Sequence, residues 1–174
     1  MASSFVAKKP EPVPAVYLGI GSNRNPEENL RLGMRELARR FELREASAVY
    51  RNAAIGFQGD DFLNAVVCVD TPKTPVDICT DLEEIHTLAG RQRDTDPFVS
   101  RTLDIDLLLY DQLVINEPPV KIPRKDVLTY SFVLRPLAEI APDLVHPVTG
   151  QTMASHWASF DKESHPLAPD RLIL

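Results

Sequence analysis

Glycine and cysteine are both scarce in this chain, and each shortage excludes a class of site. The 174 residues include 7 glycines, and the absence of a Gly-x-x-x-x-Gly-Lys-[Ser/Thr] motif excludes a P-loop. Gly19 and Gly21 lack the third glycine of a dinucleotide fingerprint. Cys68 and Cys79 allow at most one disulfide and cannot form a structural zinc site alone, so we expect buried thiols in a reducing cytoplasm.

Long apolar runs and an excess of positive charge are also missing. No stretch approaches the roughly 18 apolar residues of a membrane span, and the N-terminal segment lacks the apolar region of a signal peptide. The net charge of −6 argues against a general nucleic-acid binder. We therefore expect a cytoplasmic protein with no membrane partner and no nucleic-acid partner.

The composition is that of one folded domain with two short flanking segments. Apolar residues make up 44% and charged residues 25% of the chain, which is enough to bury a core. The proline-rich residues 1–14 are predicted to be a flexible leader. Residues 15–157 are predicted to be the domain, and residues 158–174 a C-terminal tail.

The hydrophobic pattern predicts an α+β fold. The predicted strands are residues 15–20, 43–51, 62–70 and 103–110. The predicted helices start after Asn25 as N-cap, at Thr74 with a capping box and a C-terminal Gly90, and at Thr129 with Pro142 as the stop. This order is that of a ferredoxin-like (split βαβ) sandwich, an antiparallel sheet with helices on one face. The other face is then available for ligands.

Two aspartates on one predicted strand are the strongest chemical signal. Because strand side chains alternate, Asp104 and Asp106 share one face while Ile105 points to the helices. Two carboxylates this close repel each other unless a cation lies between them, and oxygen-only ligands suit Mg²⁺ better than zinc. The alternative is a solvated edge strand with polar residues outward.

Three arginines precede the aspartates. Arg91, Arg93 and Arg101 flank a polar loop, and guanidinium groups opposite a magnesium-binding carboxylate pair suit a polyphosphate. This combination favours a nucleotide site. The alternative for each arginine alone is an ordinary surface charge.

Aromatic and imidazole side chains give weaker signals. Phe62 and Asn64 share a strand face, so an aromatic plane beside an amide suits a flat heteroaromatic ring. The alternative is a core phenylalanine and a strand-end asparagine. The four histidines, His86 among them, show no metal-ligand spacing, and we assign none of them a role.

Six motifs follow one another along the chain from about residue 15 to about residue 157. They are Gly19-Ile20-Gly21-Ser22-Asn23, Phe62-Leu63-Asn64-Ala65, Gly90-Arg91-Gln92-Arg93, Ser100-Arg101-Thr102-Leu103-Asp104-Ile105-Asp106, Phe132-Val133-Leu134-Arg135-Pro136-Leu137 and Ile140-Ala141-Pro142. Together they resemble a known family, the 6-hydroxymethyl-7,8-dihydropterin pyrophosphokinases of folate synthesis.

The resemblance implies a ferredoxin-like fold and transfer of the β,γ-pyrophosphate of ATP to the hydroxymethyl oxygen of the pterin, with release of AMP. Two Mg²⁺ ions would be held by Asp104 and Asp106. These aspartates would form the catalytic set with the phosphate-binding Arg91, Arg93 and Arg101, the first two on a mobile loop. Ile105 completes the implied ATP contacts, and Arg124 and Lys125 are our own hypothesis for phosphate contacts that replace those lost where this chain departs from the family pattern.

The same resemblance places the pterin between Phe62 and Phe132. Its ring would be read by Asn64 and by the stretch that contains Asn52, Ala53 and Ile55. One domain can hold both substrates, so a monomer is expected.

The chain departs from the family pattern in the nucleotide loops and at the rim of the pterin pocket. Phe98 is the nearest aromatic to a usual loop tryptophan, Pro123-Arg124 replaces Pro-His, and Tyr130 replaces an arginine. His86 stands where an acid is usual, and Asn52-Ala53-Ala54 replaces Thr-Pro-Pro. These changes favour, as an alternative, a paralogue with another pterin or weak activity. A ferredoxin-like RNA-binding module is a further alternative, which the acidic charge disfavours.

Overall fold

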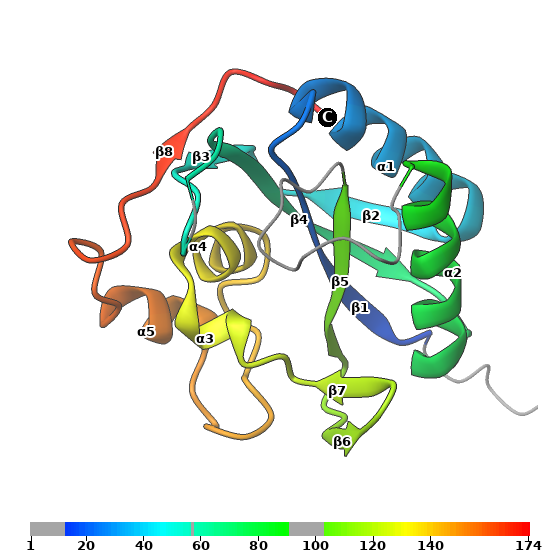
Figure 1. Cartoon of the computed structure of the whole chain (residues 1–174). Helices are drawn as coiled ribbons and strands as arrows, with labels where there is room; N and C mark the ends of the chain where they lie inside the picture. The colour runs from blue at the N-terminus through cyan, green and yellow to red at the C-terminus, as the bar shows by residue number, and fades with distance from the viewer. Residues whose placement is uncertain (1–12, 57, 91–102) are drawn as a thin grey trace, which may run out of the picture.

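The computed structural model describes residues 13–56, 58–90 and 103–174, and within these a six-stranded antiparallel sheet runs through the centre (Figure 1). The strand order is β5-β1-β4-β3-β8, and β2 also pairs with β4. A separate hairpin joins β6 and β7. The strand bounds are β1 Ala15–Ser22, β2 Glu42–Ala46, β3 Tyr50–Asn52, β4 Phe62–Asp70, β5 Asp104–Tyr110, β6 Ile115–Glu117, β7 Val120–Ile122 and β8 Ala168–Pro169.

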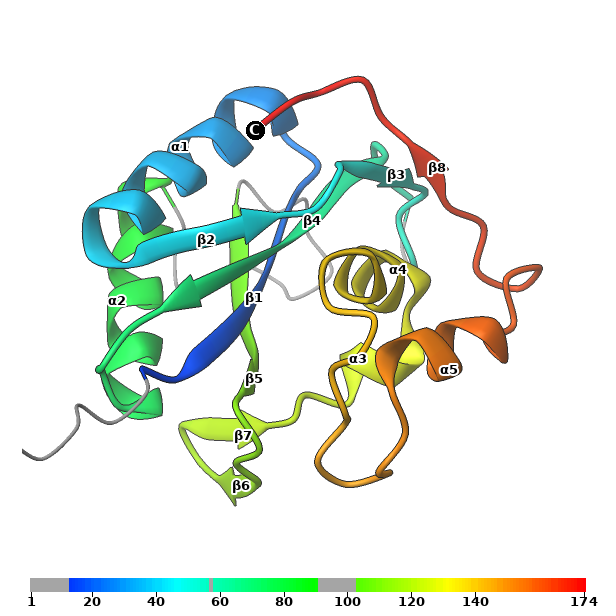
Figure 2. The same cartoon turned by 180° about the vertical axis from the view of Figure 1, so that it is seen from behind.

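Helices pack on both faces of this sheet (Figures 1 and 2). One face is covered by α1 (Pro26–Arg40) and α2 (Pro75–Leu88), and the other in part by α4 (Ser131–Ile140), flanked by α3 (Asp126–Thr129) and α5 (Met153–Ala158). The predicted α+β, ferredoxin-like fold is confirmed. The helix α4 lies on the face that the sequence left open, because its Leu134 and Leu137 join a second buried cluster with Val66.

Among the described residues, none of the helices combines the length and the apolar character that a bilayer span requires.

Local sequence signals mark both ends of α2 and the start of α1. The capping box of α2 forms as predicted: the Asp77 N–H donates to Thr74 Oγ1 (3.2 Å) and the Thr74 N–H to Asp77 Oδ2 (3.4 Å). Gly90 follows that helix with a φ of 82°. At α1, Asn25 makes no side-chain cap and instead adopts a left-handed φ of 42°, which asparagine tolerates better than most residues. The predicted N-cap position of α1 is confirmed, although the Asn25 side chain makes no capping hydrogen bond.

Two predicted elements are each divided in the structure. The strand predicted at 43–51 is two strands: between them the Ser47 N–H still donates to the Val66 carbonyl (2.9 Å), but the Val66 N–H donates to the Ser47 side chain (3.0 Å) instead of a main-chain carbonyl. The helix predicted at 129–141 starts at Ser131, since Tyr130 is extended with a φ of −120°. Pro136 lies inside α4, which continues to Ile140.

Residues after α5 run back along the domain. The strand β8 extends the sheet beyond β3, and Arg51 Nη2 lies 2.8 Å from Asp170 Oδ2 (Figure 1). Leu172 and Leu174 pack against the core cluster that α1 and α2 cover. The C-terminal segment is thus joined to the sheet edge next to β3.

We expect Asp170→Asn to lower the free energy of unfolding by about 1 kcal/mol at neutral pH, since a partly exposed ion pair contributes little more. Hydrogen bonds from the Leu172 N–H and from Arg51 lower the pKa of Asp170 in the folded protein. The carboxylate therefore stabilises the fold above the ordinary aspartate pKa, and this contribution disappears as the pH falls through the lowered pKa.

Urea unfolding of both proteins above and below that pH range measures the effect. The exposed Asp143→Asn is the matched control. A stability difference that persists unchanged at low pH would contradict the assignment.

Candidate active site

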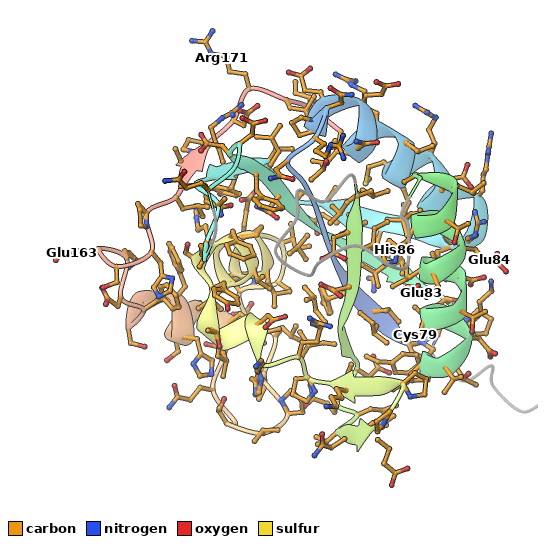
Figure 3. All side chains as sticks on the ribbon, in the orientation of Figure 1. Cys79, Glu83, Glu84, His86, Glu163 and Arg171 are labelled. Carbon is orange, nitrogen blue, oxygen red and sulfur yellow. The ribbon has the colours of Figure 1, made fainter. Side chains whose placement is uncertain are left out.

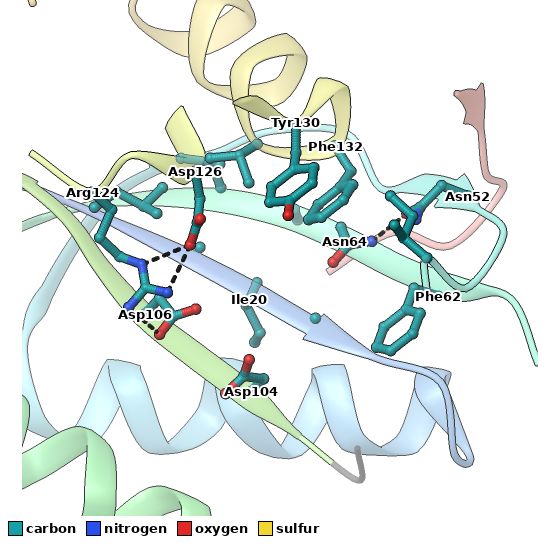
Figure 4. Close-up of a pocket in the computed structure, with 17 residues that line it drawn as sticks. Ile20, Asn52, Phe62, Asn64, Asp104, Asp106, Arg124, Asp126, Tyr130 and Phe132 are labelled. Carbon is teal, nitrogen blue, oxygen red and sulfur yellow. Dashed lines mark hydrogen bonds and ion pairs between the residues drawn. The ribbon is translucent and has the colours of Figure 1, made fainter. Parts of the chain in front are cut away.

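A cavity of about 340 Å³ lies on the sheet face opposite α1 and α2 (Figure 4). This volume falls in the range of small-molecule sites. The strand β1 forms the middle of its floor, β5 and β4 lie on either side, and the start of α4 forms part of the wall. The lining residues are Gly19, Ile20, Gly21, Asn52, Ile55, Phe62, Asn64, Ala65, Val66, Asp104, Asp106, Leu108, Arg124, Asp126, Tyr130, Phe132 and Val133.

The cavity reaches the main chain of the central strand β1, because Gly19 and Gly21 have no side chains to fill it. Gly21 pairs with Asn64 of β4 on one side and with Asp104 of β5 on the other. Gly19 likewise lies opposite Asp106. A Cβ on Gly21 would overlap Asn64 Oδ1, so a side chain there would displace the amide. The two glycines therefore leave open the space between the carboxylates and the amide.

The carboxylates of Asp104 and Asp106 lie on the same face of β5 and point into the cavity (Figure 4). Their side chains are 18% and 34% exposed, respectively. Ile105 between them is buried in the core on the opposite face, as strand alternation predicts. The cavity therefore has a wall that carries negative charge.

Arg124 lies beside these carboxylates and joins two of the acids in the cavity. Its Nη1 is 3.1 Å from Asp106 Oδ1, and its Nε and Nη2 donate to Asp126 Oδ2 at 2.9 and 2.7 Å (Figure 4). The Arg124 main-chain N–H donates to the Leu108 carbonyl (3.0 Å), which holds this residue along the edge of β5. Burial by itself would lower the pKa of Arg124. The negative charges of Asp106, Asp126 and Asp104 have the larger effect, so the pKa is raised.

The other end of the cavity combines an oriented amide with aromatic rings. Asn64 Nδ2 donates to Asn52 Oδ1 (2.6 Å), and this buried bond turns Asn64 Oδ1 toward the cavity (Figure 4). Phe62 and Phe132 lie on opposite sides of this amide, and Phe132 stacks on Tyr130 with ring centroids 5.0 Å apart. A flat ring with hydrogen-bonding edges suits this end.

The remaining predicted site residues are placed as follows. Arg91, Arg93 and Arg101 lie outside the described residues. The Ile105 side chain belongs to the core, and the side chains of Lys125 and Ala53 are not in the cavity wall that the described residues form. Sequence reasoning identified eight of the 17 described residues that line the cavity, and Asp126 and Tyr130 are among the wall residues that it missed. The only available signal for Asp126 was its position two residues after Arg124.

The donor set fits a magnesium ion. Mg²⁺ is commonly bound by one or two carboxylates, with water and substrate phosphates supplying the other oxygens. Asp104 and Asp106 provide such a pair. Within 13–56, 58–90 and 103–174, no group of three or more His, Cys, Asp or Glu residues is arranged to hold a metal ion by itself. An ion here would share its coordination with a ligand.

Comparisons with known proteins match one family. The family model for 7,8-dihydro-6-hydroxymethylpterin-pyrophosphokinase matches residues 17–142. The 2-amino-4-hydroxy-6-hydroxymethyldihydropteridine pyrophosphokinase of Haemophilus influenzae is 35% identical over 135 residues, covering 75% of this chain and 84% of that protein. Its counterpart from Methylorubrum extorquens is 37% identical over 149 residues, covering 83% and 92%.

Two longer proteins also match. The folic acid synthesis protein fol1 of Pneumocystis carinii is 33% identical over 159 residues, and this chain spans 21% of its length. A crystal structure of Plasmodium falciparum HPPK-DHPS with pteroate superposes with a TM-score of 0.69 at 12% identity, covering 87% of this chain and 43% of that one, which supports the fold. The chain, matched by the family model over most of its length, belongs to the 7,8-dihydro-6-hydroxymethylpterin-pyrophosphokinase family of folate synthesis.

Proposed function

We propose that the cavity above Gly19 and Gly21 binds both substrates. ATP would bind at the end that carries Asp104 and Asp106 (the carboxylate end), and 6-hydroxymethyl-7,8-dihydropterin at the end that carries Asn64 (the amide end). The enzyme would then transfer the β,γ-pyrophosphate of ATP to the pterin hydroxymethyl oxygen and release AMP. The observation that carries this proposal is the register of β1, in which Gly21 lies between Asp104 and Asn64. Two substrates bound on either side of this glycine would be held next to each other, which is the main requirement of phosphoryl-type transfer.

At the carboxylate end, Asp104 and Asp106 would hold two Mg²⁺ ions. When bound, the ions would neutralise the phosphate oxygens of ATP and orient the triphosphate. The aspartates cannot bind ATP themselves, because their charge repels phosphate. Arg91, Arg93 and Arg101 are proposed to contact the phosphates, as the resemblance implies.

At the amide end, the pterin ring would stack between Phe62 and Phe132. The Asn64 amide, oriented by Asn52, would accept a hydrogen bond from a ring edge through its Oδ1. No covalent protein intermediate is needed, since the hydroxymethyl oxygen attacks phosphorus directly.

A monomeric state and a cytoplasmic location stay predictions. Size-exclusion chromatography with light scattering measures the first, and fractionation of cells that express the chain measures the second. The Plasmodium falciparum HPPK-DHPS chain is longer, and this chain spans 43% of it.

Incubation with ATP, Mg²⁺ and the dihydropterin alcohol should produce AMP and the pterin pyrophosphate. Asp104→Ala and Asp106→Ala should each lower kcat by about 100-fold or more, equivalent to about 3 kcal/mol of activation free energy. Circular dichroism checks that both variants fold, and Asp143→Ala is the exposed control. Formation of ADP in place of AMP, or variants as active as the wild type, would contradict the proposed function.

Arg124→Ala should raise the KM for ATP by about tenfold, or about 1.4 kcal/mol of binding free energy. The Arg124 guanidinium pairs with the Asp106 carboxylate, and in the complex with ATP it would pair with a phosphate instead. The KM for the pterin should stay unchanged. Lys125→Ala, at an exposed position outside the described cavity wall, is the comparison and should have a smaller effect. An unchanged KM for ATP in Arg124→Ala would rule out the phosphate contact.

Gly21→Ala should raise the KM for the pterin by about tenfold, because the new Cβ displaces the Asn64 amide from its position. Gly19→Ala is the matched control, since its Cβ would meet Leu108 at an ordinary 3.4 Å and lies opposite Asp106. Steady-state kinetics with each substrate varied in turn measures both effects. Equal pterin KM values for the two variants would disprove the assignment of the amide end.

A further inference from the structure

A buried histidine holds the strand that carries the two aspartates. His86 is 3% exposed and projects from α2 toward β5 (Figure 3). Its Nε2 accepts the main-chain N–H of Ile105 at 2.8 Å. Ile105 is the residue between Asp104 and Asp106, so the imidazole binds the backbone at the midpoint of the carboxylate pair.

This contact matters because β5 is an edge strand of the sheet. The strand β1 pairs with one side of β5, and α2 packs against it. A buried main-chain N–H without an acceptor costs about 1–3 kcal/mol. On the outer edge of β5, the Ile105 N–H is satisfied by the His86 side chain, and the Leu108 carbonyl accepts the Arg124 N–H. A side chain from α2 thus does here what a neighbouring strand does elsewhere in the sheet.

The hydrogen-bond roles determine the tautomer of the ring. The Ile105 N–H can only donate, so Nε2 carries a lone pair and the ring proton is on Nδ1. Nδ1 lies 3.3 Å from Glu83 Oε1, one helical turn earlier, where it donates to the carboxylate. Glu83 therefore orients the ring, and His86 Nε2 remains 4.0 Å from Asp104 Oδ1.

We propose that His86 is a positioning residue for the metal-binding end of the cavity. By joining the Ile105 amide to α2, it sets the direction in which Asp104 and Asp106 enter the cavity, without contacting a substrate. This inference rests on the proposed role of the two aspartates. Residues that orient metal-binding carboxylates typically change metal affinity by about 10–100-fold when they are replaced.

The test compares His86→Leu, which has no acceptor, with His86→Gln, whose Oε1 can accept the Ile105 N–H. Calorimetry with a non-hydrolysable ATP analogue and Mg²⁺ should give a Kd about tenfold higher for His86→Leu. For His86→Gln the Kd should stay within about threefold of the wild type. Pterin binding should be unchanged in both, and His156→Leu on α5 is the control. Wild-type affinity in His86→Leu, or equal losses in both variants, would overturn the proposal.

A second measurement needs no variant and separates this proposal from the proposed function. Nitrogen-15 NMR of the wild-type protein should find the His86 proton on Nδ1, and hydrogen exchange should find the Ile105 amide protected. The opposite tautomer or an unprotected amide would overturn the positioning role. A wild-type protein that shows both features but does not bind the analogue with Mg²⁺ would instead contradict the proposed nucleotide site.

Discussion

The register between β1 and its two neighbours is the constraint on which the site depends. In an antiparallel sheet, directly opposed residues place their side chains on the same face. Gly21 therefore brings Asp104 and Asn64 to one surface from opposite sides, although they lie far apart in the sequence. A shift of one residue would send both side chains into the core. The apolar residues of β1, Val16, Leu18 and Ile20, are fully or almost fully buried and fix this register.

The edge position of β5 explains the contacts around the carboxylates. A strand with a partner on one side offers main-chain groups on the other, and buried groups need partners. His86 and the Arg124 backbone provide them. The same two residues lie next to Asp104 and Asp106 through their side chains. The groups that complete the sheet edge thus also lie beside the charged end of the cavity.

The sequence predicted what depends on local pattern. The capping box at Thr74, the strand Phe62–Asp70 and the common face of Asp104 and Asp106 follow from spacing alone and agree with the structure. The contact between His86 and Ile105 could not be predicted, because it joins two elements whose relative position depends on packing. The one signal for His86 was that it replaces an acid in the family pattern.

The wrong predictions for α4 and for the two glycines of β1 have a common physical cause. The helix α4 covers part of the sheet face that was expected to be open, since the sequence gives its apolar stripe but not the face on which it packs. The role of Gly19 and Gly21 was also missed. Their spacing was compared with phosphate-binding loops, whereas in the sheet they form the cavity floor. In both cases the tertiary arrangement decides between readings that the local sequence permits.

The central claim is that one cavity holds both substrates on either side of Gly21. A crystal structure with a non-hydrolysable ATP analogue, Mg²⁺ and the dihydropterin alcohol tests it most directly. The account predicts metal ions on Asp104 and Asp106, the pterin ring between Phe62 and Phe132, and its hydroxymethyl group directed along β1 toward the triphosphate. Nucleotide bound elsewhere, with Arg124 still paired to Asp106 and no ion on the aspartates, would contradict it.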